Sequence, residues 1–477
     1  MATSVSTLEG SRTELSDESI NELRSKIRGA VLRPSDAGYD KVRAPYNAMQ
    51  SDRAALIVQC AGTADVVDAV NFARENGIEV TVRGGGHSVA GLSTSDGGML
   101  IDLSPMNGVF VDPDSRIAHV QGGALWGEVD RETQLHGLAT PGGIVSDTGV
   151  AGLTLGGGEG WTRRKHGLSS DNVVAAEVVC ADGQVRRASD ETNPDLYWAL
   201  RGGGGNFGIV TSFTFRLHPL GPIVAFAGVF YPLADAAKIL RGFRNYGNMA
   251  PDEVTAQAVA ITMPADPALP EAIRDQPCLV IAGVYTGDPE DGMKVLQPLR
   301  ELGTPLADIS QSMPFTAVQS AFDPFFPRHH YQSYWKSTFL GELSDDAIDV
   351  VAQSAQERPS PITLIVTFLW GGAINRVGSE DTAFTERSAS WMASVDGNWT
   401  DPTENVANID WVRQTWSKIG QFGIGSTYLN FTGIADEGTD VGVDDAHGKN
   451  LRRLGKIKAK YDPNNFFRRN NNIAPAP

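Results

Sequence analysis

Three consecutive glycines followed by a histidine form the most chemically informative motif in this chain. The motif spans residues 83–88, reads Arg-Gly-Gly-Gly-His-Ser, and follows the apolar run 78–82, which is typical of a short strand. Glycine reaches φ > 0 and carries no side chain, so consecutive backbone N–H groups can converge on an anion such as a pyrophosphate. The histidine would then lie beside a bound cofactor. A tight glycine turn with a solvated histidine is the alternative.

Two further glycine clusters lie downstream. The second spans residues 149–161 and the third spans residues 201–210. Glycine beside a ligand permits close approach of the backbone, which favours a binding role for both clusters. A purely structural glycine-rich turn is the alternative for each.

A fourth motif, Lys-Tyr-Asp-Pro-Asn-Asn-Phe-Phe-Arg at 460–468, lies near the end of the chain. In this order and spacing, the four motifs resemble the berberine-bridge-enzyme-like branch of the vanillyl-alcohol-oxidase flavoprotein superfamily. The resemblance runs from about Ser35 to Pro475, and within the family it is strongest to the enterocin-oxidase branch. It implies an FAD-linked oxidase in which one covalent bond joins His87 to the 8α-methyl group of FAD.

The same resemblance implies a set of cofactor-binding positions. They are Arg83, Gly84, Gly85, Gly86, His87, Ser88, Thr148, Gly152, Leu153, Gly157, Gly158, Gly160, Ile209, Val210 and Asn470. Thr148 and Leu153 match positions that border the reactive face of the flavin, which oxygen must reach. Leu153 is bulkier than the valine or glycine of some oxidases. This disfavours fast peroxide formation and keeps flavin-N5-oxide chemistry open.

A second covalent bond to FAD is not expected. Many relatives form one through a cysteine six residues before the second triple glycine, and in this chain that position is Val150. Valine has no nucleophile, and no cysteine lies nearby in the sequence. The resemblance therefore implies attachment through His87 alone.

Proton handling is expected from Tyr428 and Asn430, which resemble a Tyr-x-Asn motif that relatives place at the flavin face. The two residues would share one side of a strand. If a nearby cation lowers its pKa, Tyr428 is the catalytic base; otherwise it shapes the pocket. Some relatives carry a glutamate before a Gly-Gly pair, and the matching position before residues 371–372 is Val366. The base then lies elsewhere, or the substrate chemistry differs.

An aromatic and cationic cluster, Tyr331, Tyr334, Trp335 and Lys336, lies on a predicted strand. Alternation puts Tyr334 and Lys336 on one face, where they could contact a phenolic or polyketide-like substrate as catalytic residues. Packing in the core of a sheet is the alternative. No metal is expected, because the eight histidines show no H-x-x-x-H pattern.

Composition limits the partners. The chain has 477 residues, 41% of them hydrophobic, which suits two or three domains. The net charge of −17 argues against nucleic acid or an anionic membrane as partner. Three cysteines make no disulfide framework, and we see neither a signal-peptide pattern nor a membrane span. We expect a cytoplasmic enzyme whose partners are a small organic molecule and oxygen, with the oligomeric state open.

The pattern of elements indicates an α+β fold. Upstream, we predict helices at 20–27 and 64–76, the latter capped by Thr63, and a strand at 55–60. Downstream, predicted strands alternate with helices and indicate a large antiparallel sheet. The strands are 223–231, 254–262, 278–285 and 362–370, and the helices are 288–302 and 344–357. With the resemblance, this implies a two-domain vanillyl-alcohol-oxidase-type fold. A discontinuous FAD-binding domain takes residues 1–219 and 428–477, and a substrate-binding domain takes residues 220–427.

Three functions remain open at this point. The first is an FAD-dependent oxidase that takes a hydride from a small hydroxylated or cyclic molecule, as in secondary metabolism, and passes it to flavin N5 before reoxidation by oxygen. The second is a carbohydrate oxidase of the same fold. The third is a catalytically silent flavin-binding protein. His87 weighs against the third, and Val150 and Val366 weigh against the second.

Overall fold

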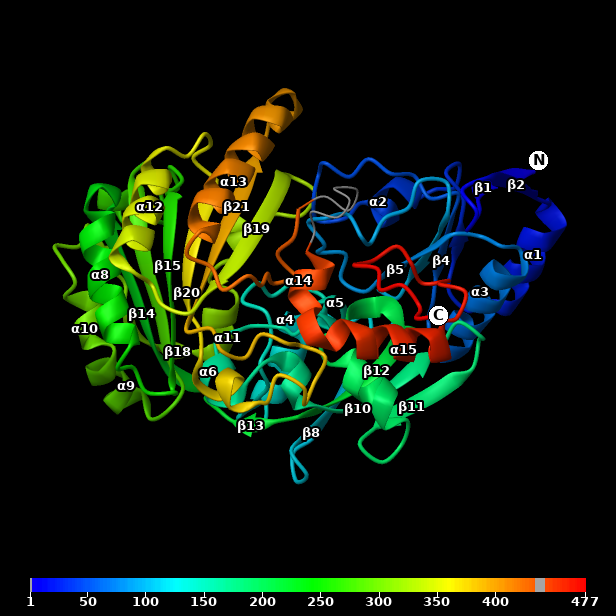
Figure 1. Ribbon diagram of the computed structural model, residues 1–477, viewed down its shortest axis with the longest axis horizontal. Helices are drawn as coiled ribbons and strands as arrows, with labels where there is room; N and C mark the ends of the chain where they lie inside the picture. The colour runs from blue at the N-terminus through cyan, green and yellow to red at the C-terminus, as the bar shows by residue number, and fades with distance from the viewer. Residues whose placement is uncertain (1, 434–441) are drawn as a thin grey trace.

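The computed structural model describes residues 2–433 and 442–477 (Figure 1). The N-terminal part is built on a small mixed sheet. Its strands, in the order β3-β4-β6-β5, are β3 (Val31–Leu32), β4 (Leu56–Gln59), β6 (Met99–Asp102) and β5 (Val80–Arg83). Helices α1 (Asp17–Lys26) and α3 (Thr63–Glu75) share a buried apolar cluster with this sheet. The side chain of Ser16 caps α1 by accepting a hydrogen bond from the amide of Ser19.

A second, antiparallel sheet follows in the order β11-β10-β12-β8-β7. Its strands are β7 (Val109–Asp112), β8 (Ile117–Gln121), β10 (Val173–Val179), β11 (Val185–Ser189) and β12 (Ile209–Arg216). The helices of this part are α2 (Tyr39–Arg43), α4 (Trp126–Gln134), α5 (Val150–Leu155), α6 (Arg163–His166) and α7 (Pro194–Leu200). Two small pairs complete it: β1 (Thr3–Ser6) with β2 (Arg12–Leu15), and β9 (Leu138–Ala139) with β13 (His218–Pro219).

The middle of the chain forms an eight-stranded sheet in which every pairing is antiparallel. Its order is β17-β14-β16-β15-β20-β21-β19, and β18 also pairs with β14. The strands are β14 (Ile223–Pro232), β15 (Val254–Thr262), β16 (Pro277–Tyr285), β17 (Ala307–Asp308), β18 (Gln311–Pro314), β19 (Gln332–Leu340), β20 (Leu364–Leu369) and β21 (Trp391–Trp399).

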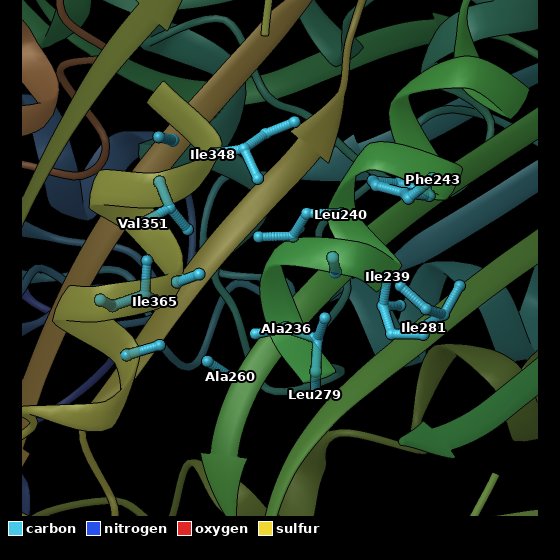
Figure 2. Close-up of a cluster of buried hydrophobic side chains, with 14 of the residues drawn as sticks. Ala236, Ile239, Leu240, Phe243, Ala260, Leu279, Ile281, Ile348, Val351 and Ile365 are labelled. Carbon is cyan, nitrogen blue, oxygen red and sulfur yellow. The ribbon is translucent and has the colours of Figure 1, made fainter. Parts of the chain in front are cut away.

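Helices cover the outer face of this sheet (Figure 1). They are α8 (Ala236–Gly247), α9 (Pro289–Val295), α10 (Gln297–Arg300), α12 (Asp345–Gln356) and α13 (Asn405–Gly420), while α11 (Phe315–Gln319) lies against α4. Figure 2 shows side chains of α8 and α12, such as Phe243 and Val351, meeting Ile281 of β16 and Ile365 of β20. The predicted helix 288–302 is divided because Pro298 has no amide hydrogen to continue the first helix.

Alternation along the strands decides which side chains face inward. On β20, Ile365 and Leu369 belong to the helix-covered core, whereas Val366 and Phe368 belong to a separate cluster on the inner face. On β19, Tyr334 lies in the outer core and Trp335 on the inner face. The inner face is turned toward the part of the molecule that holds the glycine clusters.

The C-terminal segment returns to the N-terminal part, and Figure 1 shows both chain ends on the side away from the large sheet. Helices α14 (Val443–His447) and α15 (Leu451–Tyr461) lead into it. The Lys458 ammonium group is fully buried and donates to Asp462, Asn206 O and Phe467 O at 2.7, 2.7 and 2.9 Å. Thr63 begins α3 rather than capping it, which differs from the prediction, and its hydroxyl donates to Glu177 on β10. Among the described residues, no helix has the length and apolar character to cross a membrane.

Candidate active site

One continuous pocket joins all three glycine clusters to the inner face of the large sheet. Of the predicted cofactor-binding residues, the following line it: Gly84, Gly85, Gly86, His87, Ser88, Thr148, Gly152, Leu153, Ile209, Val210 and Asn470. Asn430 lines it as well. The sheet contributes mainly apolar side chains, among them Val259, Leu364, Val366, Phe368 and Trp335.

The first glycine cluster packs directly on the start of the second. A Cβ atom on Gly85 would lie 2.4 Å from the Cα atom of Gly149, and one on Gly149 would lie 2.3 Å from the amide nitrogen of Gly85. Gly86 has φ +70°, which favours glycine. Arg83 does not line the pocket, because its guanidinium donates to the carbonyl groups of Arg43 at 2.6 Å, of Val42 and of Ser93. Its role in the structure is to hold the loop around His87.

His87 is held on two sides. The ring of Tyr46 stacks on it with a centroid distance of 4.1 Å and an interplanar angle of 16°. Its Nε2 atom lies 3.2 Å from Asp147 Oδ1, and Arg328 Nε lies 2.6 Å from the other oxygen of the same carboxylate. The sequence did not single out Asp147, since nothing local connects it with His87.

The second cluster divides into pocket-lining and packing residues. A Cβ atom on Gly152 would meet no atom within 4 Å, so this glycine borders open space. Gly157, Gly158 and Gly160 do not line the pocket and instead permit close packing. Added Cβ atoms there would lie 2.9 Å from Phe384, 2.4 Å from Ser169 and 1.6 Å from the carbonyl oxygen of Gly142. These three glycines therefore have a packing role in the structure, and their contact with the cofactor stays a prediction.

Val150, the position at which relatives carry the second covalent link, is fully buried in the apolar cluster beneath α5 and lies outside the pocket lining. Valine is not a nucleophile. Cys60, Cys180 and Cys278 are buried and outside the lining.

The third cluster and the C-terminal segment close the far end of the pocket. Asn470 Nδ2 donates to the carbonyl oxygens of Phe467 at 3.0 Å and of Gly205 at 3.4 Å, which joins the two segments. Several pocket-lining polar atoms have no hydrogen-bond partner among the described residues. They are Thr81 Oγ1, Ser93 Oγ, Gln257 Oε1 and Asn470 Oδ1. Buried polar atoms of this kind require a ligand or water, and a long, polar cofactor such as FAD fits them together with the open space at Gly152.

Tyr428 and Asn430 come together in a turn rather than on a strand. The Tyr428 hydroxyl accepts hydrogen bonds from the amides of Gly158 at 2.9 Å and Glu159 at 3.1 Å, and from Asn430 Nδ2 at 2.9 Å. Tyr428 is buried and does not line the pocket. The condition for Tyr428 as a base, a pKa lowered by a nearby cation, is not met, because burial and the neighbouring Glu159 raise the pKa of Tyr428. The hydroxyl group anchors the backbone that carries Glu159.

Asp396 on β21 is the carboxyl group of the inner sheet face. It is 4% exposed and lines the pocket, and among the described residues its side chain receives a hydrogen bond from Ser394 Oγ. Burial raises the pKa of Asp396 to about 7, and the charge of Glu159 acts in the same direction. Val366 is the position at which some relatives carry a glutamate. It pairs with Ser394 on β21, which lies two residues before Asp396 on that strand. A lone carboxyl group at an inward position of β21 is the sequence signal that identifies it.

Glu159 also lines the pocket and forms a buried ion pair with Arg163, with Nη1 and Oε2 separated by 2.8 Å. The same guanidinium donates to the carbonyl oxygen of Leu369 at 3.0 Å on the large sheet. Burial raises the pKa of Glu159, although Arg163 opposes this shift. The pair therefore connects the second glycine cluster with the large sheet.

Tyr334 and Lys336 do not lie at the pocket, which corrects their predicted catalytic placement. Arg413 of α13 donates to the Tyr334 hydroxyl at 3.2 Å, and the Lys336 ammonium group lies 4.7 Å from the ring centroid of Trp416 on the same helix. Trp335 between them faces the pocket. The alternation of side chains along this strand was predicted, but the prediction put Tyr334 and Lys336 on the pocket side of the sheet, where Trp335 lies instead. Within the described residues, no group of three or more His, Cys, Asp or Glu side chains could hold a metal ion.

Comparisons with known proteins agree with this geometry. A model of an FAD binding domain matches residues 54–189, and a model named "berberine and berberine like" matches residues 427–474. An FAD-linked oxidoreductase of Dictyostelium discoideum is 31% identical over 96% of this chain and 97% of its own. A xylooligosaccharide oxidase of Thermothelomyces thermophilus is 29% identical over 96% of this chain and 94% of its own. The crystal structure of 6-hydroxy-D-nicotine oxidase from Arthrobacter nicotinovorans superposes with a TM-score of 0.83 at 25% identity, covering 94% of this chain and 98% of that one.

Proposed function

Because this chain belongs to the berberine-bridge-enzyme-like family of FAD-linked oxidoreductases, we propose that it is an oxidase of a small hydroxylated or cyclic organic molecule. The observation that carries the proposal is the pocket that joins the glycine clusters to an apolar sheet face bearing Asp396. When bound, FAD supplies a hydride acceptor at N5 and returns the electrons to molecular oxygen. Membership of the family sets the silent flavin-binding alternative aside.

FAD would be held by the pocket-lining residues of the three glycine clusters and by Asn470. His87 provides the covalent bond to the 8α-methyl group, and valine in place of cysteine at Val150, with no cysteine in the pocket lining among the described residues, supports a single bond. The similarity to the enterocin-oxidase branch and the choice of flavin-N5-oxide chemistry stay predictions. Likewise, the division into a cofactor domain of 1–219 and 428–477 and a substrate domain of 220–427 is our proposal. The location of the eight-stranded sheet within 223–399 supports it.

Asp396 is the residue we assign as general base. A base works best when its pKa lies near the working pH, and the pKa of Asp396 is raised to about 7. In its deprotonated form, Asp396 takes the proton of a substrate hydroxyl or amine group while the adjacent C–H bond gives up its hydride. Glu159, held by Arg163, keeps a second acidic group beside the substrate. Tyr428 and Asn430 support Glu159 rather than exchanging protons themselves.

The lining of the pocket favours a compact, largely apolar substrate. Val259, Leu364, Val366 and Phe368 offer no hydrogen bonds, whereas a sugar chain has hydroxyl groups on every side that need partners. Gln257 of β15 and Asp396 of β21 are polar side chains that the large sheet adds to the lining, and Glu159 lines the same pocket. They suit one oxygen or nitrogen function on a ring. A carbohydrate substrate remains the second candidate because a relative of nearly full length is a xylooligosaccharide oxidase.

A substrate screen under nitrogen tests the proposal. The yellow protein is mixed with benzylic and phenolic alcohols, cyclic amines and xylooligosaccharides, and the loss of the visible flavin absorbance is followed. We expect bleaching by members of the first two groups and slow or no bleaching by the sugars. Rapid bleaching by xylooligosaccharides alone would replace the proposal by the second candidate.

A further inference from the structure

We propose that Asp147 is the positioning residue for covalent attachment of FAD. The carboxylate beside His87 Nε2 favours a proton on that nitrogen and leaves the Nδ1 lone pair free to form the bond. The inference rests on the proposed function in one respect, namely that His87 is the attachment residue. Asp147 lies in the loop between residues 144 and 148, which leads from the α4–β9 region to the second glycine cluster. It is brought to His87 only by the fold.

The two ring nitrogens of His87 are in different surroundings. Nε2 lies 3.2 Å from Asp147 Oδ1. Among residues 2–433 and 442–477, Nδ1 makes no hydrogen bond, whereas Nε2 is in contact with Asp147 Oδ1 without hydrogen-bond geometry, and His87 lines the pocket. A carboxylate beside Nε2 favours the tautomer with hydrogen on that atom, which leaves the lone pair on Nδ1. Stacking against Tyr46 at 4.1 Å fixes the plane of the ring, so the lone pair has a defined direction.

Asp147 is itself firmly held. Arg328 approaches from the substrate side of the molecule, with Nε 2.6 Å from Asp147 Oδ2 and Nη2 2.6 Å from the carbonyl oxygen of Asp147. The preceding residue, Ser146, donates from its amide to Asp323 at 2.8 Å. Burial would raise the pKa of Asp147, but His87 and Arg328 outweigh it and keep the pKa below the usual range. The carboxylate is therefore charged at neutral pH and lies 3.2 Å from Nε2, where its charge favours a proton on that nitrogen.

The attachment step balances with oxygen as the oxidant. A C–N bond forms between His87 Nδ1 and the 8α carbon, while the methyl group releases one proton to solvent. As positive charge develops on the imidazole, the Nε2 proton can pass to Asp147 and from there to water. The two electrons left on the cofactor reduce molecular oxygen to hydrogen peroxide, which also takes up the two protons. Stabilisation of the developing imidazolium by the adjacent carboxylate is the contribution that Asp147 makes.

A clamp role is the competing explanation, since Asp147 also joins two parts of the molecule through Arg328. The two roles are separable by mutation. Asp147→Ala removes both the contact with His87 and the contact with Arg328, and Asp147→Asn keeps the shape but removes the charge. Arg328→Gln removes the ion pair that joins the two parts of the molecule and keeps the Asp147 carboxylate beside His87. Ser146→Ala is the matched control, since it changes the adjacent side chain and leaves the carboxylate in place.

The test measures covalent FAD by intact mass after acid denaturation, at intervals during incubation of freshly purified, incompletely loaded protein with added FAD and air. Noncovalent FAD affinity and thermal stability are measured in parallel. For Asp147→Asn and Asp147→Ala we expect incorporation slowed by about 10–100-fold, the usual effect of losing the partner that orients a histidine. FAD affinity should change little. Added formate should speed incorporation in Asp147→Ala, a rescue that a clamp would not give. Arg328→Gln and Ser146→Ala should stay within about 3-fold of the wild type, well short of that loss.

Two results would overturn the inference: incorporation in Asp147→Asn and Asp147→Ala at the rate of Ser146→Ala, or an equal loss in Arg328→Gln and Asp147→Ala without formate rescue. Failure of the proposed function looks different. In that case the wild type carries no covalent FAD, or His87→Ala carries it as the wild type does.

Discussion

Asp396 of β21 lies directly opposite Leu364 of β20, and both side chains line the pocket. On the β20 side, the cross-strand neighbour of the carboxyl group is thus an apolar side chain that cannot stabilise a charge, and on the β19 side it is Trp335, whose Nε1 donates to Asn398. Burial accordingly raises the pKa of Asp396 to about 7. A carboxyl group with this pKa gives up and regains a proton near neutral pH, which suits a base in oxidation of an alcohol or amine.

Replacement of Tyr428 tests whether its hydroxyl is structural. Tyr428→Phe leaves the amide groups of Gly158 and Glu159 without their acceptor, so we expect the free energy of unfolding to fall by about 1–3 kcal/mol. Flavin reduction should slow far less than the roughly 10²–10⁴-fold that loss of a general base causes. Urea denaturation and anaerobic stopped-flow measure the two effects. Tyr197→Phe, which loses one hydrogen bond to the backbone carbonyl of Val173 outside the pocket lining, is the control. Unchanged stability with a hundredfold slower reduction would make Tyr428 the base.

The two kinds of glycine in the second cluster should respond differently to side chains. Gly152→Leu places its side chain in open pocket space, so we expect a folded protein with little bound FAD. Gly160→Ala places Cβ 1.6 Å from the carbonyl oxygen of Gly142, so we expect loss of the fold itself. The ratio of flavin to protein absorbance and the thermal midpoint distinguish these outcomes. Full FAD content in Gly152→Leu would remove Gly152 from the cofactor site.

Much of the predicted cofactor site could be identified from the sequence, because runs of glycine indicate positions where the backbone approaches a ligand closely or adopts a positive φ. The sequence placed Gly84 to Gly86 and His87 after a strand, and the structure has β5 ending at Arg83 and these residues at the pocket. The strand 254–262 has the predicted bounds, since its apolar run is long and ends at turn residues. What local patterns could not decide was which glycines contact the pocket and which, like Gly160, permit close packing.

The candidate catalytic residues were harder to predict from the sequence, because their positions depend on tertiary contacts. Alternation groups Tyr334 with Lys336, but only the packing of α13 against β19 shows that this pair faces the helices. The sequence did not single out Asp396 because the resemblance pointed to the position of Val366 on β20. Asp396 lies instead on the neighbouring strand β21. Contacts between distant segments, such as that of His87 with Asp147, leave no local signal at all.

The buried lysine of α15 should matter more than its exposed neighbour. Lys458→Met leaves the Asp462 carboxylate unpaired in the interior, so we expect a loss of about 3–5 kcal/mol in the free energy of unfolding. Lys460→Met breaks a half-exposed pair with Asp195 and should cost about 0–1 kcal/mol. Equal effects in denaturant titrations would argue against the C-terminal segment as an integral part of the cofactor domain.

Asp130 gives a stability prediction with a defined sign. Burial raises its pKa to about 7, although the hydrogen bond from Gln319 opposes this. The folded state therefore holds the proton more tightly than the unfolded state, and the stability this contributes is lost as the pH rises from about 4 to about 7. Asp130→Asn has no carboxyl group that titrates, so it does not lose this stability. As the pH rises over the same interval, its thermal midpoint should therefore rise relative to that of the wild type. A constant difference between the two proteins across this range would contradict the shift.

The most direct measurement is the rate of flavin reduction in anaerobic stopped-flow between about pH 5 and pH 9, with a substrate found in the screen. Wild type, Asp396→Asn and Asp130→Asn are compared, since Asp130 has a carboxyl group with a similarly raised pKa outside the pocket. We predict that the wild type and Asp130→Asn speed up as the pH rises through about 7, the pKa of Asp396. Asp396→Asn should be slower by about 10²–10⁴-fold and lack this step. A wild-type rate and pH profile in Asp396→Asn would contradict the assignment of Asp396 as the base.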